Sequence, residues 1–375
     1  MTELTAYTGV RIFDGDAWHD NAALVTDGAR IHSIGPVPPG ARTVALDGGI
    51  LAPGLIDLQV NGGGGHLVGP STTLDDLRLV CETHARFGVT ALLPTLITDT
   101  ADVTDSVLAA GAAAARTNVP GFLGLHLEGP HLALSRKGAH DPALIRPMDE
   151  ADLVRLERAR ATLPHLLVTV ATESVMPEQI ARLVKAGIVV SLGHTDASFE
   201  AVTAAVRAGA SMATHLFNAM SQIGNREPGL VGATLHHGAM SAGLIADGIH
   251  VHPTTLALAL RAKTGPGRIF LVSDSMSQAG TDLESFTLNG RTIHRRDGAL
   301  RLDDGTLAGA DLTLDAGLRY AHRTLGLDLG EALRMASLYP AHAIGSDRGK
   351  LAPGSRSDVV HLAGDLMVRQ VFIAA

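Results

Sequence analysis

The chain has 375 residues, 46% of them hydrophobic and 18% charged, which supports a large buried core and excludes a disordered protein. A formal net charge of −8 and an aromatic content of 3% argue against binding to nucleic acid or to an anionic membrane. There is one cysteine, no recognisable signal peptide and no apolar stretch of the ~20 residues that span a bilayer, so we expect a soluble, cytoplasmic protein without internal disulfides.

The two ends of the chain share one pattern. Short β-rich segments, separated at the N-terminal end by Asp-Gly turn dipeptides, occupy residues 6–13, 23–26, 30–34 and 358–373. Leu-Ala-Pro-Gly marks both junctions, at residues 51–54 and 351–354. The sequence therefore predicts a small β domain made of residues 1–52 plus 345–375, with residues 53–344 inserted as the main domain.

Between these ends, short apolar β-rich segments alternate with longer segments rich in Ala, Leu and Arg. The predicted strands are residues 55–60, 91–96, 122–127, 166–171, 188–192, 211–214, 243–246 and 269–272. The predicted helices are residues 73–87, 100–116, 177–186, 199–208 and 254–263. Eight strands with intervening helices indicate a parallel sheet buried on both faces, closed as a (β/α)8 barrel. An open doubly wound sheet is the alternative. Three turn dipeptides predict hairpins within residues 284–310.

Polar side chains stand at or just after the C-terminal ends of the predicted strands. They are Gln59, Asn61, Glu128, Glu173, His194, His215, Asp247, His250 and Asp274. In a barrel these strand ends meet at one mouth, where active sites lie. The periodic placement therefore predicts a single site assembled from residues that are far apart in the sequence.

The residue types at these positions suit metal-assisted hydrolysis. Glu128, His194 and His215 offer one carboxylate and two imidazoles, a ligand set for catalytic zinc that leaves a fourth position for water. Bound zinc lowers the pKa of that water to about 7. Asp274 ends an apolar strand, and a carboxylate there can deprotonate the water and then protonate a leaving amine.

Loops near the predicted mouth carry cations. Arg136 and Lys137 follow the third strand and Arg226 follows the sixth. Such loops suit a phosphate or carboxylate substrate. The glycine-rich segment at residues 61–65 has neither the Lys-Ser/Thr ending of a P-loop nor the dinucleotide-binding pattern, which argues against a nucleotide.

Several short motifs occur in order along nearly the whole chain. They are Pro-Gly-Leu-Ile-Asp-Leu-Gln-Val-Asn-Gly at 53–62, Leu-Glu-Gly-Pro at 127–130, Lys-Gly-Ala-His at 137–140, Gly-His-Thr at 193–195, Ala-Thr-His-Leu-Phe-Asn-Ala-Met at 213–220, Arg-Glu-Pro-Gly at 226–229, Ala-Asp-Gly-Ile-His at 246–250, Ser-Asp at 273–274 and Gly-Thr-Leu-Ala-Gly at 305–309. In these motifs the chain resembles the N-acetylglucosamine-6-phosphate deacetylases of the amidohydrolase superfamily.

The resemblance implies a barrel with a small β-sandwich built from both termini, a homodimer, and hydrolysis of the acetamide of N-acetyl-D-glucosamine 6-phosphate to D-glucosamine 6-phosphate and acetate. It implies one divalent metal per subunit, with zinc expected, at Glu128, His194 and His215, and Asp274 as the general base and acid. The implied substrate contacts are Ala139, His140, Asn218, Ala219, Arg226, His250 and Leu307. His140 and His250 are also implied in catalysis, and which of them polarises the carbonyl is left open.

Two features depart from common family patterns. Many amidohydrolases carry His-x-His after the first strand and bind a second metal there, whereas this chain has Gln59 and Asn61. Amide side chains are poor ligands for transition metals, so these residues mark the remnant of a second site and predict a single metal. The segment at residues 273–278 also differs and leaves the sugar preference open. The alternatives are a deacetylase of N-acetylgalactosamine 6-phosphate, another amidohydrolase, or a non-catalytic barrel scaffold.

Overall fold

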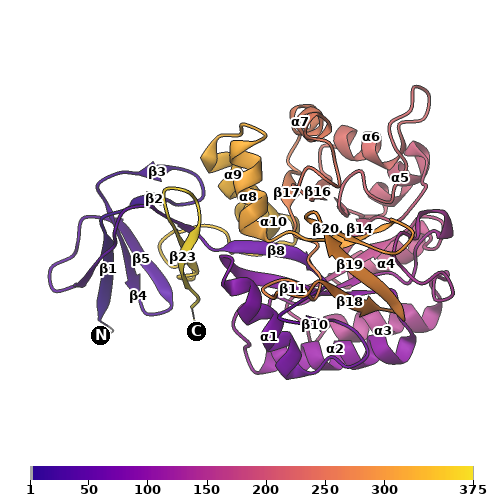
Figure 1. The fold of residues 1–375 in the computed structure, drawn as a ribbon, viewed down its shortest axis with the longest axis horizontal. Coiled ribbons are helices and arrows are strands. Elements are labelled where there is room, and N and C mark those ends of the chain that lie inside the picture. Colours follow the sequence, from indigo (N-terminus) through magenta and orange to yellow (C-terminus); the bar gives the residue numbers. More distant parts are fainter. Residues whose placement is uncertain (1–2, 375) are drawn as a thin grey trace.

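The computed structural model describes residues 3–374, and its centre is a sheet of eight parallel strands (Figure 1). In sheet order they are β8 (Leu55–Val60), β11 (Val89–Ile97), β12 (Leu125–Glu128), β13 (Leu166–Val170), β14 (Val189–Leu192), β15 (Met212–Ala213), β16 (Ser241–Leu244) and β17 (Ile269–Leu271). A parallel bridge between Val60 and Ser275 joins the first strand to the segment after the last. This closure confirms the predicted barrel and excludes the open sheet.

Helices follow the strands around the outside of the barrel. They are α1 (Leu74–Ala85), α2 (Ala101–Arg116), α3 (Glu150–Arg160), α4 (Pro177–Lys185), α5 (Phe199–Arg207), α6 (Gly229–His236), α7 (Pro253–Ala262), α8 (Leu314–Arg323), α9 (Leu329–Ala336) and α10 (Leu338–Ala343), with a short 3-10 helix at Leu134–Arg136. Side-chain caps begin several of them, as at Thr73, where a reciprocal capping box with Asp76 starts α1. Within the described residues, no helix has the length and apolar composition that crossing a bilayer requires.

The five predicted helices are confirmed, but the sequence patterns did not indicate α3. This helix is mostly charged and buries only a narrow stripe, so its apolar periodicity is weak. An Asp149–Asp152 capping box starts it, and Arg146 and Arg155 pair with Asp152. Caps and ion pairs, rather than an apolar face, mark this helix in the sequence.

The predicted strand at residues 6–13 was wrong as a single element. The structure divides it into β1 (Leu4–Thr8) and β2 (Arg11–Phe13), which belong to different sheets. Gly9 between them has φ of +80°, and a Cβ there would lie 2.5 Å from the carbonyl oxygen of Leu46. A glycine is therefore required at the point where the chain leaves one sheet for the other.

Both ends of the chain meet in two further sheets beside the barrel (Figure 1). One sheet has the order β5 (Arg30–Gly35), β4 (Ala23–Asp27), β1, β6 (Arg42–Ala45), and the other has the order β23 (Val368–Phe372), β22 (Val359–Leu362), β7 (Ile50–Pro53), β2, β3 (Trp18–His19). Buried residues from both sheets, including Leu24, Ile31, Leu51 and Val359, form one apolar cluster. The sandwich formed by both termini is thereby confirmed, while the boundaries at 52 and 345 stay a prediction.

The predicted hairpins after the eighth strand form a separate antiparallel sheet. Its strands are β18 (Ser285–Leu288), β19 (Arg291–Arg296), β20 (Ala299–Arg301) and β21 (Leu307–Ala310). The amide of Ala310 donates a hydrogen bond of 2.8 Å to the carbonyl of Asp274, so this hairpin sheet is anchored beside the end of the last barrel strand.

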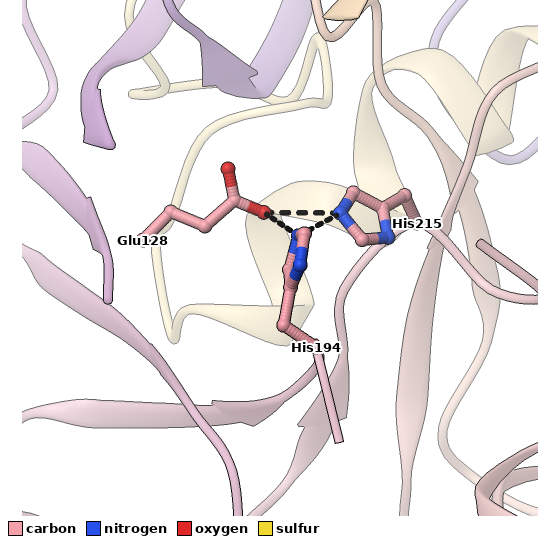
Figure 2. A group of neighbouring side chains, drawn as sticks. All are labelled: Glu128, His194 and His215. Atoms are coloured by element: carbon pink, nitrogen blue, oxygen red, sulfur yellow. Dashed lines mark hydrogen bonds and ion pairs between the residues drawn. The ribbon is translucent and has the colours of Figure 1, made fainter. Parts of the chain in front are cut away.

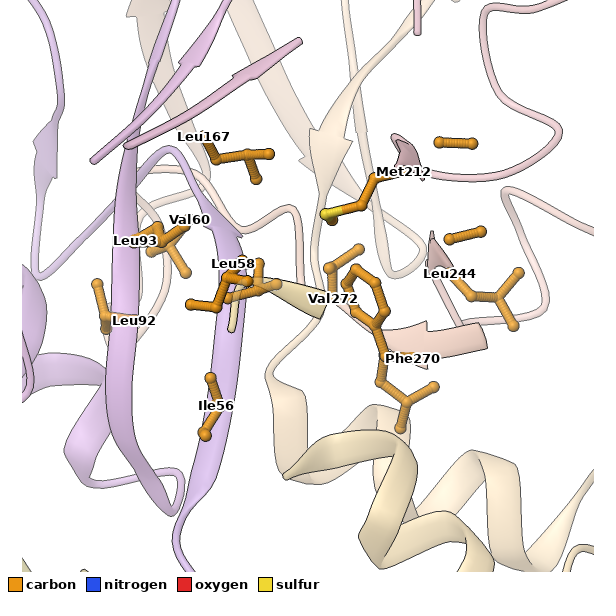
Figure 3. Close-up of a cluster of buried hydrophobic side chains, with 14 of the residues drawn as sticks. Ile56, Leu58, Val60, Leu92, Leu93, Leu167, Met212, Leu244, Phe270 and Val272 are labelled. Carbon is orange, nitrogen blue, oxygen red and sulfur yellow. The ribbon is translucent and has the colours of Figure 1, made fainter. Parts of the chain in front are cut away.

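The barrel core is built from the apolar strand residues that the sequence predicted. Figure 3 shows Ile56, Leu58 and Val60 of β8 among side chains from the other strands, including Phe270. These strands are buried along their whole length, which explains why their sequences are nearly continuous apolar runs.

One charged side chain interrupts this apolar core. Asp57 of β8 is fully buried and accepts hydrogen bonds of 3.2 Å from the backbone amides of Ser273 and Gln59. Burial raises its pKa from the ordinary 3.8 to about 7, against the opposing effect of these hydrogen bonds. The stability contributed by the protonated form is fully present below pH 3.8 and is lost as the pH rises to about 7.

Replacing Asp57 by the neutral Asn should remove this pH dependence. We expect the melting temperature of the wild type, relative to that of Asp57→Asn, to be higher at about pH 5 than at about pH 8. Differential scanning fluorimetry of both proteins in metal-saturated buffer measures this difference. An equal difference at the two pH values would contradict a raised pKa of Asp57.

Candidate active site

Three buried side chains converge at the mouth of the barrel. Glu128 ends β12, and His194 and His215 each stand two residues after a strand, β14 and β15. Glu128 Oε1 lies 3.3 Å from His194 Nε2 and 3.0 Å from His215 Nε2, and the two nitrogens are 3.1 Å apart. Figure 2 shows the three side chains pointing toward one another. The predicted ligand set therefore forms a single cluster.

The chemistry of this cluster fits a divalent cation. His194 Nδ1 lies 2.8 Å from the carbonyl oxygen of Arg136, so this nitrogen carries the ring proton and donates a hydrogen bond to that oxygen. The lone pair of His194 Nε2 then faces the cluster, as it must in a metal ligand. All three side chains are nearly inaccessible to water. One carboxylate and two imidazoles held so closely match a catalytic zinc site with a fourth position free.

The backbone changes direction abruptly at these residues. His194, His215 and Asp274 have φ values of 47°, 28° and 50°, in the left-handed region that non-glycine residues rarely occupy. Each stands just past a barrel strand, which explains why these strands end where they do. Strained backbone of this kind is typical of functional sites.

The charged groups in and beside the cluster change one another's pKa values. Burial alone would raise the pKa of Glu128, but hydrogen bonds and charge interactions with His194 and His215 hold the pKa of this carboxyl well below its usual range. Asp274 has the opposite shift, since burial and then the negative charge of Glu128 raise its pKa to about 6. The two carboxyl groups are thus separated in acidity, one suited to stay ionised and the other to exchange a proton.

Gln59 and Asn61 support these carboxylates. Gln59 Nε2 donates a hydrogen bond of 3.1 Å to Glu128 Oε1, and Asn61 Nδ2 donates one of 2.7 Å to Asp274 Oδ1. Both residues, which the sequence motifs indicated as the remnant of a second metal site, act here as hydrogen-bond donors. This arrangement favours a single metal.

His140 and His250 have their rings fixed by neighbours. The backbone amide of Thr98 donates to His140 Nδ1 at 3.3 Å, so the proton of the neutral ring is on Nε2, which lies 3.9 Å from Glu128 Oε2. Burial and the charge of His194 lower the pKa of His140 to about 3. His250 Nδ1 lies 2.6 Å from Asp247 Oδ2, which leaves its Nε2 available to a substrate.

A cavity of about 510 Å³ opens above the cluster. Its walls include these predicted site residues: Asn61, Glu128, Ala139, His140, His194, His215, Asn218, Ala219, His250, Asp274 and Leu307. Gln59 lies behind Glu128 and does not line the cavity. Arg226 is exposed on the loop before α6 and is absent from the cavity wall of its own chain.

Of the cavity wall that comes from the hairpin sheet, the sequence motifs indicated only the segment around Leu307. Leu288 and Arg301 line the cavity with Leu307, and Met276 joins them from the preceding loop. No local motif could have found Leu288 or Arg301, because the fold of the hairpins over the mouth is decided by tertiary packing. Arg301 places a positive charge on the cavity wall that the sequence motifs did not indicate.

Comparison with known proteins agrees with this geometry. Residues 50–375 match the amidohydrolase family, and the chain belongs to that family. It is 43% identical over 330 residues to an N-acetylgalactosamine-6-phosphate deacetylase of Shewanella sp. (strain ANA-3), covering 88% of this chain and 83% of that protein. It is 35% identical over 347 residues to the N-acetylglucosamine-6-phosphate deacetylase of Haemophilus influenzae, covering 91% and 90%.

Solved structures are similar over nearly the whole chain. The N-acetylglucosamine-6-phosphate deacetylase of Pasteurella multocida has a TM-score of 0.95 at 33% identity, covering 99% of this chain and 98% of that one. A variant of the Mycobacterium smegmatis enzyme, in complex with N-acetyl-D-glucosamine-6-phosphate, has a TM-score of 0.90 at 31% identity with the same coverage. The resemblance drawn from the sequence motifs is confirmed.

The cluster predicts one tightly bound divalent metal per chain. Glu128→Gln should lower metal affinity by at least ~100-fold, since even the loss of an outer hydrogen-bond partner costs 10–100-fold. Elemental analysis measures the metal content per chain, and competition with a chelating dye measures the metal affinity. Glu157→Gln on α3, which removes a surface partner of Arg182, is the matched control and should leave affinity unchanged. Two metal equivalents in this one cluster would contradict the single-metal site.

Proposed function

We propose that this protein hydrolyses the acetamide of N-acetyl-D-glucosamine 6-phosphate to D-glucosamine 6-phosphate and acetate. The observation that carries the proposal is one cavity that holds the Glu128, His194 and His215 cluster beside Asp274. N-acetyl-D-galactosamine 6-phosphate is the second candidate, favoured by the name of the 43% identical relative. Both substrates require the same hydrolysis of a linear amide.

The metal would be held by Glu128, His194 and His215, with zinc as our expectation from the ligand types. When bound, it supplies Lewis acidity, which makes water acidic enough to be deprotonated near pH 7 and polarises the substrate carbonyl. The chain's own groups do the rest. His140 Nε2–H faces the cluster and would donate a hydrogen bond to the acetamide oxygen. His250 Nε2 would contact the substrate, an amino-sugar phosphate.

Asp274 would move the proton. Its Oδ1 is held by Asn61, which leaves Oδ2 to take a proton from the attacking water and to return it to the departing amine. Burial raises the pKa of Asp274 above the ordinary 3.8, which makes the carboxylate a stronger base while it stays mostly ionised at neutral pH. The non-catalytic scaffold is disfavoured, because all of these groups are present in one cavity.

Asp274→Asn should keep the shape of the site and remove the base. We expect kcat to fall by at least ~10²-fold, as for loss of general acid–base catalysis, with the metal content unchanged. In the wild type, kcat/KM should fall as the pH drops and Asp274 becomes protonated, with a midpoint below about 6, because a bound divalent cation favours the ionised carboxylate. Acetate release and elemental analysis check both points, with the exposed Asp303→Asn as control. A near-normal kcat in Asp274→Asn would move the role elsewhere.

Phosphate recognition by Arg226 requires a second subunit in this proposal. Because Arg226 is exposed and outside the cavity of its own chain, we propose that it reaches the phosphate bound by its partner in a homodimer. Arg226→Ala should raise KM for the phosphorylated sugar, with a loss of about 2 kcal/mol in kcat/KM. Slow turnover of the unphosphorylated sugar should hardly change.

Mixed dimers distinguish action within a subunit from action between subunits. One subunit carries Arg226→Ala and the other carries Asp274→Asn. If Arg226 acts on the partner's substrate, one of the two sites has both groups, and a low KM returns with about half the activity. If Arg226 acts in its own subunit, neither site is complete and KM stays high. Equal losses on phosphorylated and unphosphorylated sugars would contradict any phosphate role.

We also propose that the protein acts in the cytoplasm, where its single cysteine would stay reduced. A panel of N-acetylated hexosamines, with and without the 6-phosphate, decides the sugar preference. Acetate release from the glucosamine isomer alone, the galactosamine isomer alone, or both separates the two candidates. Release from neither phosphorylated sugar would refute the proposed function.

A further inference from the structure

The hairpin sheet supplies the outer wall of the cavity. Arg301, at the end of β20, lines the cavity together with residues 305–309, and it pairs directly with Leu307 of β21. Directly paired residues of antiparallel strands present their side chains on the same face of the sheet. Arg301 and Leu307 therefore share the face that is turned to the cavity.

Two other arginines near the cavity are already engaged. Arg136 binds Asp196 through Nε at 3.0 Å and Nη2 at 2.7 Å, and Arg291 donates a hydrogen bond to the carbonyl oxygen of Ala139. Arg301 donates one hydrogen bond of 3.0 Å, from Nη1 to the carbonyl oxygen of Gly305, and has no carboxylate partner among residues 3–374. Its guanidinium has five N–H donors, so most of them remain available to a ligand.

We propose that Arg301 binds the phosphate group of the substrate from the same chain that holds the metal cluster, and so determines specificity for phosphorylated amino sugars. This inference rests on the proposed function and deepens it. Arg301 has no part in the resemblance to the deacetylase motifs, and its role follows from its place on the cavity wall.

The shape of the substrate places the phosphate toward the rim. In a hexopyranose, C2 carries the acetamide and stands opposite C5, which carries the phosphorylated C6. When the acetamide reaches the buried cluster, the phosphate points outward, to the side where Arg301 is exposed. A phosphate monoester carries about −1.5 to −2 charges at neutral pH, and the carboxylates of Glu128 and Asp274 repel it from the cavity floor.

The chemistry of arginine matches this ligand. A guanidinium binds a phosphate through two parallel charge-assisted hydrogen bonds, a geometry that lysine cannot reproduce. A cation on the hairpin sheet also complements Arg226, which in our proposal comes from the partner subunit. The doubly charged phosphate would then be held from both sides of the mouth.

The test compares Arg301→Gln with Arg301→Lys and with Arg296→Gln as matched control. Arg296 is exposed at the end of the neighbouring strand β19 and does not line the cavity. For N-acetyl-D-glucosamine 6-phosphate, Arg301→Gln should raise KM by at least ~10-fold with little change in kcat, as for the loss of one charged hydrogen-bonding partner. Arg301→Lys should recover part of this loss, and Arg296→Gln should behave like the wild type.

The second part of the test uses unphosphorylated N-acetyl-D-glucosamine as the substrate. Its kcat/KM should be the same in the wild type and in Arg301→Gln. Equal losses on both sugars would show that Arg301 only braces the hairpin through Gly305, and no loss on either would show that it does not contact the substrate. Either result overturns the inference while the proposed function stands.

Direct binding separates this inference from the proposed function. Isothermal titration of glucosamine 6-phosphate and of glucosamine into the metal-loaded proteins should show weaker binding of the phosphorylated sugar alone in Arg301→Gln. This result supports the phosphate contact even for a wild-type enzyme that fails to deacetylate the phosphorylated substrates. Unchanged binding of glucosamine 6-phosphate would overturn it. Melting temperatures of the variants confirm that each is folded.

Discussion

The position of Asp274, the proposed acid–base carboxylate, depends on the hydrogen bonds that close the barrel. The amide of Asp274 donates a hydrogen bond of 3.0 Å to the carbonyl of Gln59, and the amide of Asn61 donates one of 2.8 Å to the carbonyl of Ser275. These bonds join the first strand to the segment that follows the last. They also set the side chain of Asp274 against that of Asn61. The segments that close the barrel therefore also place two residues of the site, Asn61 and Asp274.

The electrostatics of the site follow from this closure. The barrel mouth buries two carboxyl groups, Glu128 and Asp274, close enough for the charge of one to raise the pKa of the other. An uncompensated buried charge is costly, so such a pair requires nearby cations or hydrogen-bond donors. His194 and His215 face Glu128, and the amides of Gln59 and Asn61 donate to the two carboxylates. A divalent cation held by these groups would complete the neutralisation.

In the proposed function, catalysis and substrate specificity depend on different parts of the molecule. The groups for bond breaking stand at the ends of buried barrel strands, where packing fixes them to the accuracy that chemistry requires. The groups that we propose to recognise the rest of the substrate come from the hairpin sheet and the exposed loop before α6. Insertions at the rim can change without disturbing the barrel. Related enzymes could therefore accept different amino sugars with the same catalytic floor.

The limits of helix and strand patterns are visible in particular elements. Buried strands such as β8 and β13 are long apolar runs, and their places in the chain were predictable to within a residue. The segment at residues 122–127 was placed too early, because Gly124 meets the carbonyl of His165 so closely that a Cβ would lie 2.0 Å from it, and the regular strand begins only at Leu125. In the sequence, such a close approach between two backbone segments is marked only by a glycine.

The sequence by itself determined the barrel, the joining of both termini and the convergence of Glu128, His194, His215 and Asp274. Apolar periodicity reports burial, and a barrel brings all strand ends to one mouth, so local patterns suffice for these features. Only the tertiary structure decided that Arg226 lies outside the cavity of its own chain, that Asn61 holds Asp274, and that Arg301 lines the wall. Exposed loops and hairpins have no burial pattern that shows where they point, since their direction is set by packing against distant parts of the chain.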